Sequence, residues 1–327
     1  ISGSSSAAIA AVGQIMIPRM VREGYPEGHA TALVACSSVL ALLIPPSIPM
    51  IVFSITGGLS VGAAFLSTII PGILLTILYC VLNIWFLRND QNIKVEPQLP
   101  FKQAATGVVK TGYNAAFALL MPLIILGAIY SGIATPTEAA AIAVIYAIPV
   151  GLFIYKGMSL KSLGAVTVRA VTMTGSIMAV LFFLFIMSRA MILEQVPRDL
   201  AQALLTISDN KYVLLLLINL LLLLIGMIVD DISGSVLAAI IFLPIINELG
   251  IDPIHFAAVV GVNLGLGNVS PPCAPMLYMA GGVSKLSLDR YITPTVKFLC
   301  FGHLPMVFLV TFVPELSLFL PKLLMGY

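Results

Sequence analysis

Two pairs of adjacent prolines interrupt apolar stretches of this sequence. Pro45-Pro46 follows a run rich in leucine and isoleucine, and Pro271-Pro272 follows Gly265 to Ser270, where glycines allow close backbone approach. A proline lacks a backbone donor and clashes with the preceding helical turn, so the carbonyls before each pair lose their helical partners. In hydrocarbon these carbonyls need other partners, and a bound cation is one natural choice.

Hydroxyl-rich segments are the second feature that indicates ion chemistry. Serines occupy positions 2 and 4–6 near the start of the chain, and the segment 233–235 reads Ser-Gly-Ser. Hydroxyl and carbonyl oxygens with few fixed charges favour a monovalent cation such as Na+ over Ca2+, which usually recruits carboxylates. The helices expected at these segments, 4–22 and 236–249, would direct their N-termini towards an anionic substrate group.

Each of these features also has a purely structural explanation. A plain kink explains one proline pair, but two pairs beside matched serines favour a functional role. Arg189 lies near the end of a predicted span and either reaches to the membrane interface or pairs with a substrate carboxylate. Asp230 and Asp231 either cap the following helix or tune the site. Structural roles are favoured for two histidines and for the glutamate of a Thr-Pro-Thr-Glu capping box: His29, His255 and Glu138.

The composition defines the environment in which these residues act. Of the 327 residues, 60% are hydrophobic and 9% are charged, against about 25% charged in an ordinary soluble domain. So few charges cannot cover a soluble globule, and we expect an all-α polytopic membrane protein. The net charge of +2 does not indicate nucleic-acid binding, and the four widely spaced cysteines indicate neither a zinc site nor a disulfide framework.

The apolar runs predict the spans that must position the prolines and serines. A spanning helix needs about 20 mostly apolar residues. We expect full crossings near residues 29–57, 63–87, 108–132, 137–155, 171–193, 253–283 and 291–313. The run Tyr212–Val229 is shorter and leads directly into the polar segment 230–235 and the helix 236–249. This pattern predicts a re-entrant helical hairpin, whose tip must be buried or line a cavity.

Basic residues orient the predicted spans. If the hairpin enters and leaves on one side, 12 of the 16 Lys and Arg residues fall on one face of the membrane and the other 4 on the opposite face. The positive-inside rule makes the richer face cytoplasmic, so the C-terminus is expected to face outward.

A repeat relates two parts of the sequence. Ile-Ser-Gly-Ser occurs at residues 1–4 and again at 232–235. Seven residues are identical to the residue 226 positions later in the sequence. Pro18, Gly24, His29, Pro45, Pro46, Pro49 and Met50 correspond in this way to Pro244, Gly250, His255, Pro271, Pro272, Pro275 and Met276. Five predicted crossings separate the copies, so the second copy is inverted, and inverted repeats with broken helices are typical of secondary transporters. The first copy is expected to lack the first arm of its hairpin, as in part of a longer protein.

These elements divide the chain into four expected regions. They are a first inverted repeat over 1–87, a charged cytoplasmic linker over 88–110, connecting and scaffold helices over 111–210, and a second inverted repeat over 211–327. Two re-entrant hairpins and two Pro-Pro-broken helices, one of each per repeat, are expected to meet near the membrane midplane.

The segments Ser2–Ala7, Ile17–Tyr25, Ile44–Met50, Ala134–Ala140 and Asn268–Pro275 together resemble the large membrane subunit of TRAP transporters, the DctM-like or M subunit. The resemblance extends over essentially the whole chain. It implies an elevator-type fold and Na+-coupled uptake of an organic acid, either sialic acid or a C4-dicarboxylate. It places the chain in the bacterial inner membrane, with the C-terminus periplasmic. It also implies two partner proteins, a small four-helix Q subunit and a periplasmic substrate-binding P protein.

The resemblance further implies where ions and substrate bind. One Na+ site would use the first tip and first break, through Ser4, Ser5, Ser6, Ile44 and Pro45. A second would use the second tip and second break, through Ser233, Gly234, Ser235, Gly267, Asn268 and Ser270. The substrate would lie between the two, near Ser47, Cys273, Arg189 and Asp231.

Other functional classes remain open at this point. A hairpin-type, ion-coupled anion transporter that works without a binding protein would share the same features. An intramembrane enzyme is disfavoured because the sequence has no HExxH, GxSxG, P-loop or Cys/His cluster. A channel would share the broken helices but would need a continuous open pathway.

Overall fold

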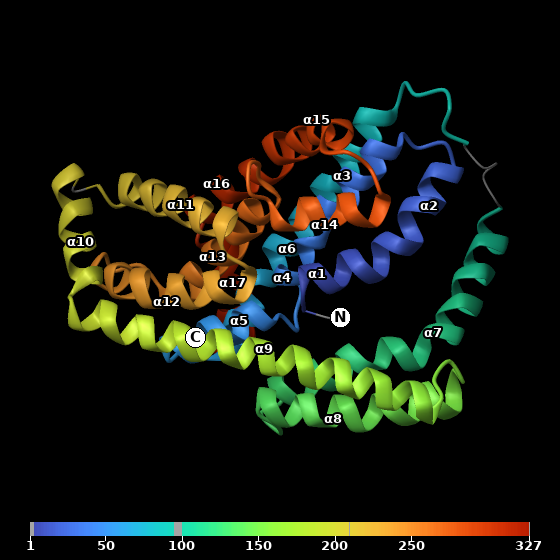
Figure 1. Ribbon diagram of the computed structural model, residues 1–327, viewed down its shortest axis with the longest axis horizontal. Coiled ribbons are helices and arrows are strands. Elements are labelled where there is room, and N and C mark those ends of the chain that lie inside the picture. The colour runs from blue at the N-terminus through green and yellow to red at the C-terminus, as the bar shows by residue number, and fades with distance from the viewer. Residues whose placement is uncertain (1–2, 95–99, 209, 327) are drawn as a thin grey trace. The chain divides into compact units, whose positions relative to one another are not determined.

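The computed structural model describes residues 3–94, 100–208 and 210–326, and every regular element within them is helical. The chain forms two compact units (Figure 1). The larger unit contains residues 1–94 and 183–327, and the smaller unit contains residues 95–182.

The first part of the larger unit runs from the first serines to the first long helix. Its elements are α1 (Ser5–Ala8), the π-helical turn η1 (Ile9–Gly13), α2 (Gln14–Arg22), α3 (Glu27–Ser38), α4 (Leu40–Leu43), α5 (Ile48–Gly57) and α6 (Val61–Leu87). Ser60 begins α6 by accepting a hydrogen bond from the Ala63 amide at 3.3 Å.

The second part of the larger unit begins with the end of α9 and continues to the C-terminus. Its elements are α10 (Val196–Ile207), α11 (Lys211–Ile228), α12 (Asp231–Glu248), α13 (Pro253–Val269), α14 (Pro275–Ser284), α15 (Leu288–Phe298), η3 (Leu299–His303), α16 (Leu304–Phe312) and α17 (Glu315–Met325). Asp252 begins α13 by accepting from the Ile254 amide at 2.7 Å, with Pro253 at the first helical position.

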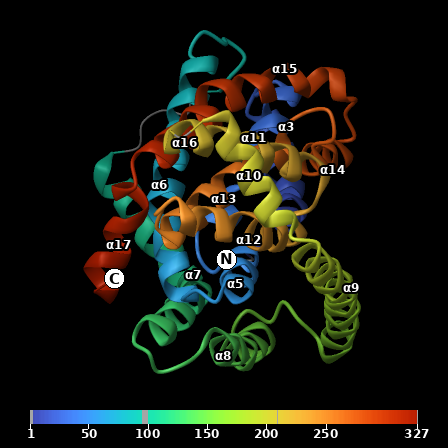
Figure 2. The same cartoon turned by 90° about the vertical axis from the view of Figure 1, so that its left-hand side faces the viewer.

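Helix α13 forms the centre of the larger unit. All residues from Ile254 to Val269 are buried, and Figure 2 shows the helix enclosed by its neighbours. It packs against α6, α11, α12 and α16. A helix that is apolar and buried on every side is the expected form for the core of a membrane protein.

The smaller unit contains α7 (Phe101–Tyr130), α8 (Pro136–Pro149), η2 (Val150–Ile154) and most of α9 (Leu160–Leu193). Helices α7 and α8 pack together, and the Tyr146 hydroxyl donates to the Phe117 carbonyl at 2.8 Å. Thr135 and Glu138 form the expected capping box at the start of α8.

The described residues contain seven helices that are long and apolar enough to cross a membrane, or eight if the bent pair α3–α4 and α5 is one span. This count agrees with the expected multi-pass membrane protein in helix length and composition. It differs from the prediction in two places: α11 and α12, expected as the arms of a re-entrant hairpin, are each long enough to cross, and the expected crossing 253–283 is divided between the shorter helices α13 and α14. The prolines at the predicted breaks do interrupt helices, since α4 ends at Leu43 and α13 at Val269.

Three predicted boundaries are wrong. The helix expected at 236–249 begins at Asp231, because the Asp230 carboxylate accepts from the Ile232 and Ser233 amides and draws the serines into the first helical turn. Helix α9 begins at Leu160 rather than near 171. The charged segment 88–110 becomes helical at Phe101, so only its first part is a linker; its residues 95–99 lie outside the described residues.

Candidate functional site

The two proline pairs produce similar breaks. After α4, Ile44 has extended backbone angles, the Pro45–Pro46 peptide is cis, and Ser47 precedes α5. The helix axes on either side of this break differ by 40°. After α13, Ser270 is extended and the Pro271–Pro272 peptide is also cis. Both breaks therefore expose carbonyl groups that a continuous helix would have used internally.

The first serine segment lies against the first break. The Gly3 carbonyl accepts a hydrogen bond from the Ile48 amide at 3.2 Å, directly after the break. Gly3 has a positive φ of 63°, and a Cβ at this position would lie 2.4 Å from the Pro46 carbonyl oxygen. Only glycine therefore fits here, and it brings Ser4 close to the break. The Ser4 and Ser6 hydroxyls are 2.9 Å apart.

The second serine segment is the buried N-terminus of α12. Ser233 and Ser235 are buried, and the Ser235 hydroxyl donates to the Asp231 carbonyl at 2.7 Å. Helices α11 and α12 contact each other and are joined only by Val229 and Asp230. The same hairpin reaches the second break, because the backbones of Gly226 and Gly267 are in direct contact.

A hydrogen-bonded bridge joins the two segments to each other and to the second break. The Ser5 hydroxyl donates to Asp231 Oδ2 at 2.7 Å. The Asn268 side-chain amide donates to Asp231 Oδ1. All three side chains are buried, so Ser5, Asp231 and Asn268 form a polar centre inside an apolar unit. The aspartates, predicted either to cap the following helix or to tune the site, make different contacts: Asp230 caps α12, whereas Asp231 forms this bridge.

Two buried oxygens beside the breaks have no hydrogen-bond partner among the described residues. They are Ser47 Oγ, which follows the first proline pair, and Asn268 Oδ1, which precedes the second. Unpartnered buried oxygens are costly and uncommon, and they mark positions where a ligand would be stabilising. The described residues contain no group of three or more His, Cys, Asp or Glu that could hold a metal ion. Hydroxyl, amide and backbone carbonyl oxygens, with the single carboxylate of Asp231, are the oxygen ligands that this centre offers.

The structure does not bring all the predicted substrate residues together. Cys273 follows the second break and is exposed. Ile192, one turn after Arg189, lines a pocket of about 380 Å³ with the C-terminal half of α12, from Ile240 to Glu248. Asp231 lies at the other end of α12, nine or more residues away, which corresponds to about 13 Å or more along the helix. Arg189 itself is exposed on α9.

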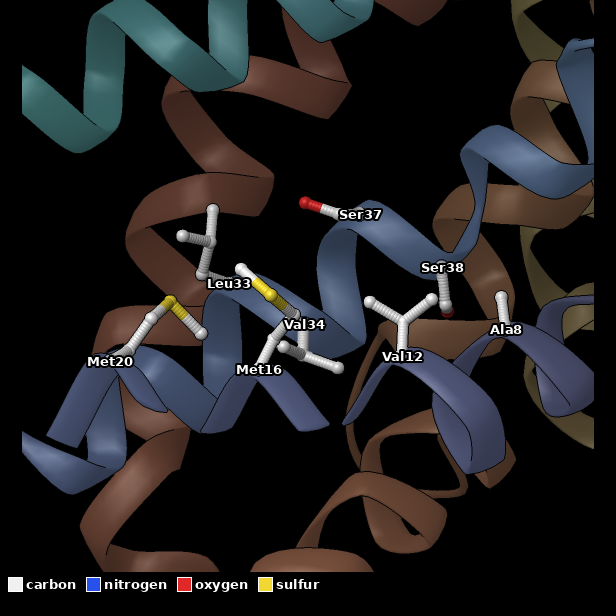
Figure 3. Close-up of a pocket in the computed structure, with 8 residues that line it drawn as sticks. All are labelled: Ala8, Val12, Met16, Met20, Leu33, Val34, Ser37 and Ser38. Carbon is white, nitrogen blue, oxygen red and sulfur yellow. The ribbon is translucent and has the colours of Figure 1, made fainter. Parts of the chain in front are cut away.

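An apolar groove of about 230 Å³ runs between η1–α2 and α3 (Figure 3). Its lining residues are Ala8, Val12, Met16, Met20, Leu33, Val34, Ser37 and Ser38. The residues 226 positions after Ser37 and Ser38 are Asn263 and Leu264, and both contact α11. Asn263 donates a hydrogen bond to Asn219 at 3.1 Å, and Leu264 packs against Gly226. At this offset, two groove residues, Ser37 and Ser38, thus pair in sequence with residues that contact α11.

Comparison with known proteins gives one consistent family. Residues 1–316 match the family described as "Tripartite ATP-independent periplasmic transporter, DctM component". The isethionate TRAP transporter permease protein DctMQ of Oleidesulfovibrio alaskensis is 33% identical over 98% of this chain and 49% of its own length. The C4-dicarboxylate TRAP transporter large permease protein DctM of Pseudomonas aeruginosa is 34% identical over 98% of this chain and 74% of its own. The sialic acid TRAP transporter large permease protein SiaM of Vibrio cholerae is 34% identical over 100% and 75%. The chain thus spans about half the length of the first relative and about three quarters of the other two.

Proposed function

Because this chain belongs to the family of DctM components of tripartite ATP-independent periplasmic transporters, we propose that it forms the large permease subunit of a Na+-coupled organic-acid importer. The substrate is a carboxylate-bearing anion, either sialic acid or a C4-dicarboxylate. Relatives named for both kinds of substrate match the chain about equally well, at 34% identity each.

The observation that carries this proposal is the meeting of two serine segments and two helix breaks. The Gly3–Ile48 hydrogen bond joins the first segment to the first break. The contact between Asn268 and Asp231 joins the second break to the second segment. Freed carbonyls, hydroxyls and a buried carboxylate thus lie within one unit, and this all-oxygen chemistry suits Na+.

We assign two Na+ sites to this region. The first uses oxygens of the first segment and first break, from Ser4, Ser5, Ser6, Ile44 and Pro45. The second uses oxygens of the second segment and second break, from Ser233, Gly234, Ser235, Gly267, Asn268 and Ser270. The unpartnered Asn268 Oδ1 supports the second assignment, since a cation would provide the partner that the protein does not.

The substrate is assigned to the space near Ser47 and Cys273. Ser47 offers a buried hydroxyl without a partner, and Cys273 occupies the matching position after the second break. Helices α5 and α14 begin just after these residues. Their N-termini carry partial positive charge, which favours binding of a carboxylate. Arg189 remains a prediction for this site. Asp231 is better suited to the ion sites, because its carboxylate would repel an anionic substrate.

An inverted repeat is the architecture that we propose for transport. Several helix boundaries in the two halves differ by 226 residues. These are the first residues of α1 and α12, the first residues of α3 and α13, and the last residues of α4 and α13. The N-caps Ser4 and Asp230 also correspond, so this offset, rather than the Ile-Ser-Gly-Ser match at 232–235, aligns the tips. Inverted repeats support alternating access, here by an elevator movement of the hairpins and broken helices.

The proposed setting is the bacterial inner membrane, with the C-terminus in the periplasm. We propose that the permease works with a small four-helix Q subunit and with a periplasmic P protein that delivers the substrate. The name of one relative, DctMQ, couples the letters of the large and small components, and that relative is about twice as long as the matched region.

Uptake into proteoliposomes of the complete transporter tests the proposal. The binding protein is loaded with sialic acid, a C4-dicarboxylate or isethionate, and an inward Na+ gradient is imposed while an ionophore removes any proton gradient. We expect saturable uptake of one of the carboxylates that stops when Na+ is replaced by choline. Uptake that continues without Na+ would refute the coupling, and uptake without binding protein would favour a transporter that acts alone.

A further inference from the structure

Two pairs of residues that correspond at the 226-residue offset touch each other. Ser5 corresponds to Asp231, and their side chains form the 2.7 Å hydrogen bond. Val39 corresponds to Gly265, and a Cβ at Gly265 would lie 2.1 Å from Val39 Cγ1. In a two-fold arrangement, equivalent residues can touch only where the axis passes between them. The axis relating the two halves therefore passes through both contacts.

The contact between Ser5 and Asp231 joins corresponding positions that carry different functional groups. One half contributes a hydroxyl and the other half contributes a carboxylate. Within the described residues the one ion pair joins Arg290 to Glu27, so the Asp231 carboxylate has no cationic side chain as a partner. Its oxygens are held instead by Ser5 and Asn268. A buried carboxylate with only neutral partners is costly, and a nearby bound cation would reduce that cost.

We propose that Asp231 is a positioning residue that couples the two Na+ sites. Its bond to Ser5 reaches the first site, and its bond to Asn268 reaches the second. When a cation orders one tip, the bridge fixes Asp231 and thereby orders the ligands of the other site, so that the first ion facilitates binding of the second. This coupling rests on the proposed Na+-driven function.

The Na+ dependence of uptake by the complete transporter in proteoliposomes is the measurement. For Asp231→Asn we expect the half-saturating Na+ concentration to rise about tenfold, because the shared charge is removed, and the Hill coefficient to fall towards one. Asp231→Ser reproduces the hydroxyl of the other half and should show the same two changes. If either variant is not monodisperse in detergent, the other still provides the test.

Asp230→Asn is the matched control. It removes the same charge from the adjacent residue, and asparagine retains the N-cap of α12. We expect its half-saturating concentration and Hill coefficient to stay within about twofold of wild type, because within the part of the chain that the structure describes the Asp230 carboxylate bonds to backbone amides of its own helix.

Ser5→Ala combined with Asp231→Asn tests whether the two residues act through their shared bond. The double variant should be less affected than the sum of the two single changes, since both remove the same bridge. Fully additive changes in half-saturation, or an unchanged Hill coefficient in monodisperse Asp231 variants, would overturn the coupling while leaving Na+-driven uptake intact. If the wild-type transporter itself shows no Na+ dependence, the proposed function fails first.

Discussion

Gly267 is a position where a single added methyl group should directly disturb the site. A Cβ here would lie 2.6 Å from the Cα and carbonyl carbon of Gly226 in α11, and 2.8 Å from the Leu223 carbonyl oxygen. These are backbone atoms, so no change of rotamer relieves the clash. Ordinary contacts of a Cβ begin at 3.4 Å, so Gly267→Ala requires α11 to move away from α13 by about 0.8 Å.

The expected cost follows from two opposing effects. Forcing a methyl group into a well-packed contact costs about 1–3 kcal/mol, and a clash with backbone atoms belongs to the upper part of that range, about 2–3 kcal/mol. Replacing glycine by alanine inside a helix stabilises the helix by about 1 kcal/mol, because alanine has the higher helix propensity. The net loss of stability is about 1–2 kcal/mol, which corresponds to a fall in Tm of roughly 2–8 °C. Because Gly267 precedes the second break, we also expect weaker Na+ dependence of uptake.

Thermal unfolding in detergent measures the first effect, and Gly282→Ala is its control. Gly282 lies in α14 with nothing within 4 Å of an added Cβ. The control should therefore leave the Tm unchanged or raise it slightly. A Gly267→Ala variant as stable as wild type, measured alongside a normal control, would show that α11 and α13 are not packed as tightly as described.

Three further predictions address the site and its support. Ser4→Ala and Ser235→Ala should each raise the half-saturating Na+ concentration of uptake several-fold without reducing expression, and unchanged values in both would contradict the ion-site assignment. Asn219→Leu removes hydrogen bonds that tie α11 to α13 and α16, and should lower stability by about 1–2 kcal/mol in thermal unfolding; an unaltered Tm would contradict this role for the network. With the other two exposed cysteines replaced, a maleimide should label Cys273 but not buried Cys36, and bound substrate should slow the labelling; equal rates with and without substrate would argue against a substrate site at the second break.

Six of the seven predicted crossings coincide with a candidate span or with the bent pair, because apolar length and proline are local properties of the sequence; the exception is 253–283. The breaks after Leu43 and Val269 follow from the chemistry of proline, which acts within one helical turn. Helix starts were less predictable, because they depend on a single capping bond. The polar segment from Asp230 to Ser235 looked like an irregular tip, but the Asp230 carboxylate makes it the first turn of α12.

The contact between Ser5 and Asp231 was not predicted, although both residues belonged to candidate sites. It joins residues 226 positions apart, and no local pattern indicates such a contact. The offset does contain a signal, since both residues are the first of their helices once the two halves are aligned at 226 rather than by Ile-Ser-Gly-Ser. The identities of the ion and substrate ligands remain predictions.

Some corresponding residues of the two halves differ in polarity. This difference makes the two proposed Na+ sites unequal. Leu42 in the first half corresponds to Asn268 in the second, and Ser5 corresponds to Asp231. In both cases the second half carries the more polar side chain, and these two side chains bond to each other. A charge placed in both halves would bring two carboxylates together at the axis, where they would repel each other. One carboxylate facing one hydroxyl avoids this repulsion and still provides negative charge next to both proposed sites. In the proposed two-fold arrangement, the asymmetry at Ser5 and Asp231 follows from their contact at the axis.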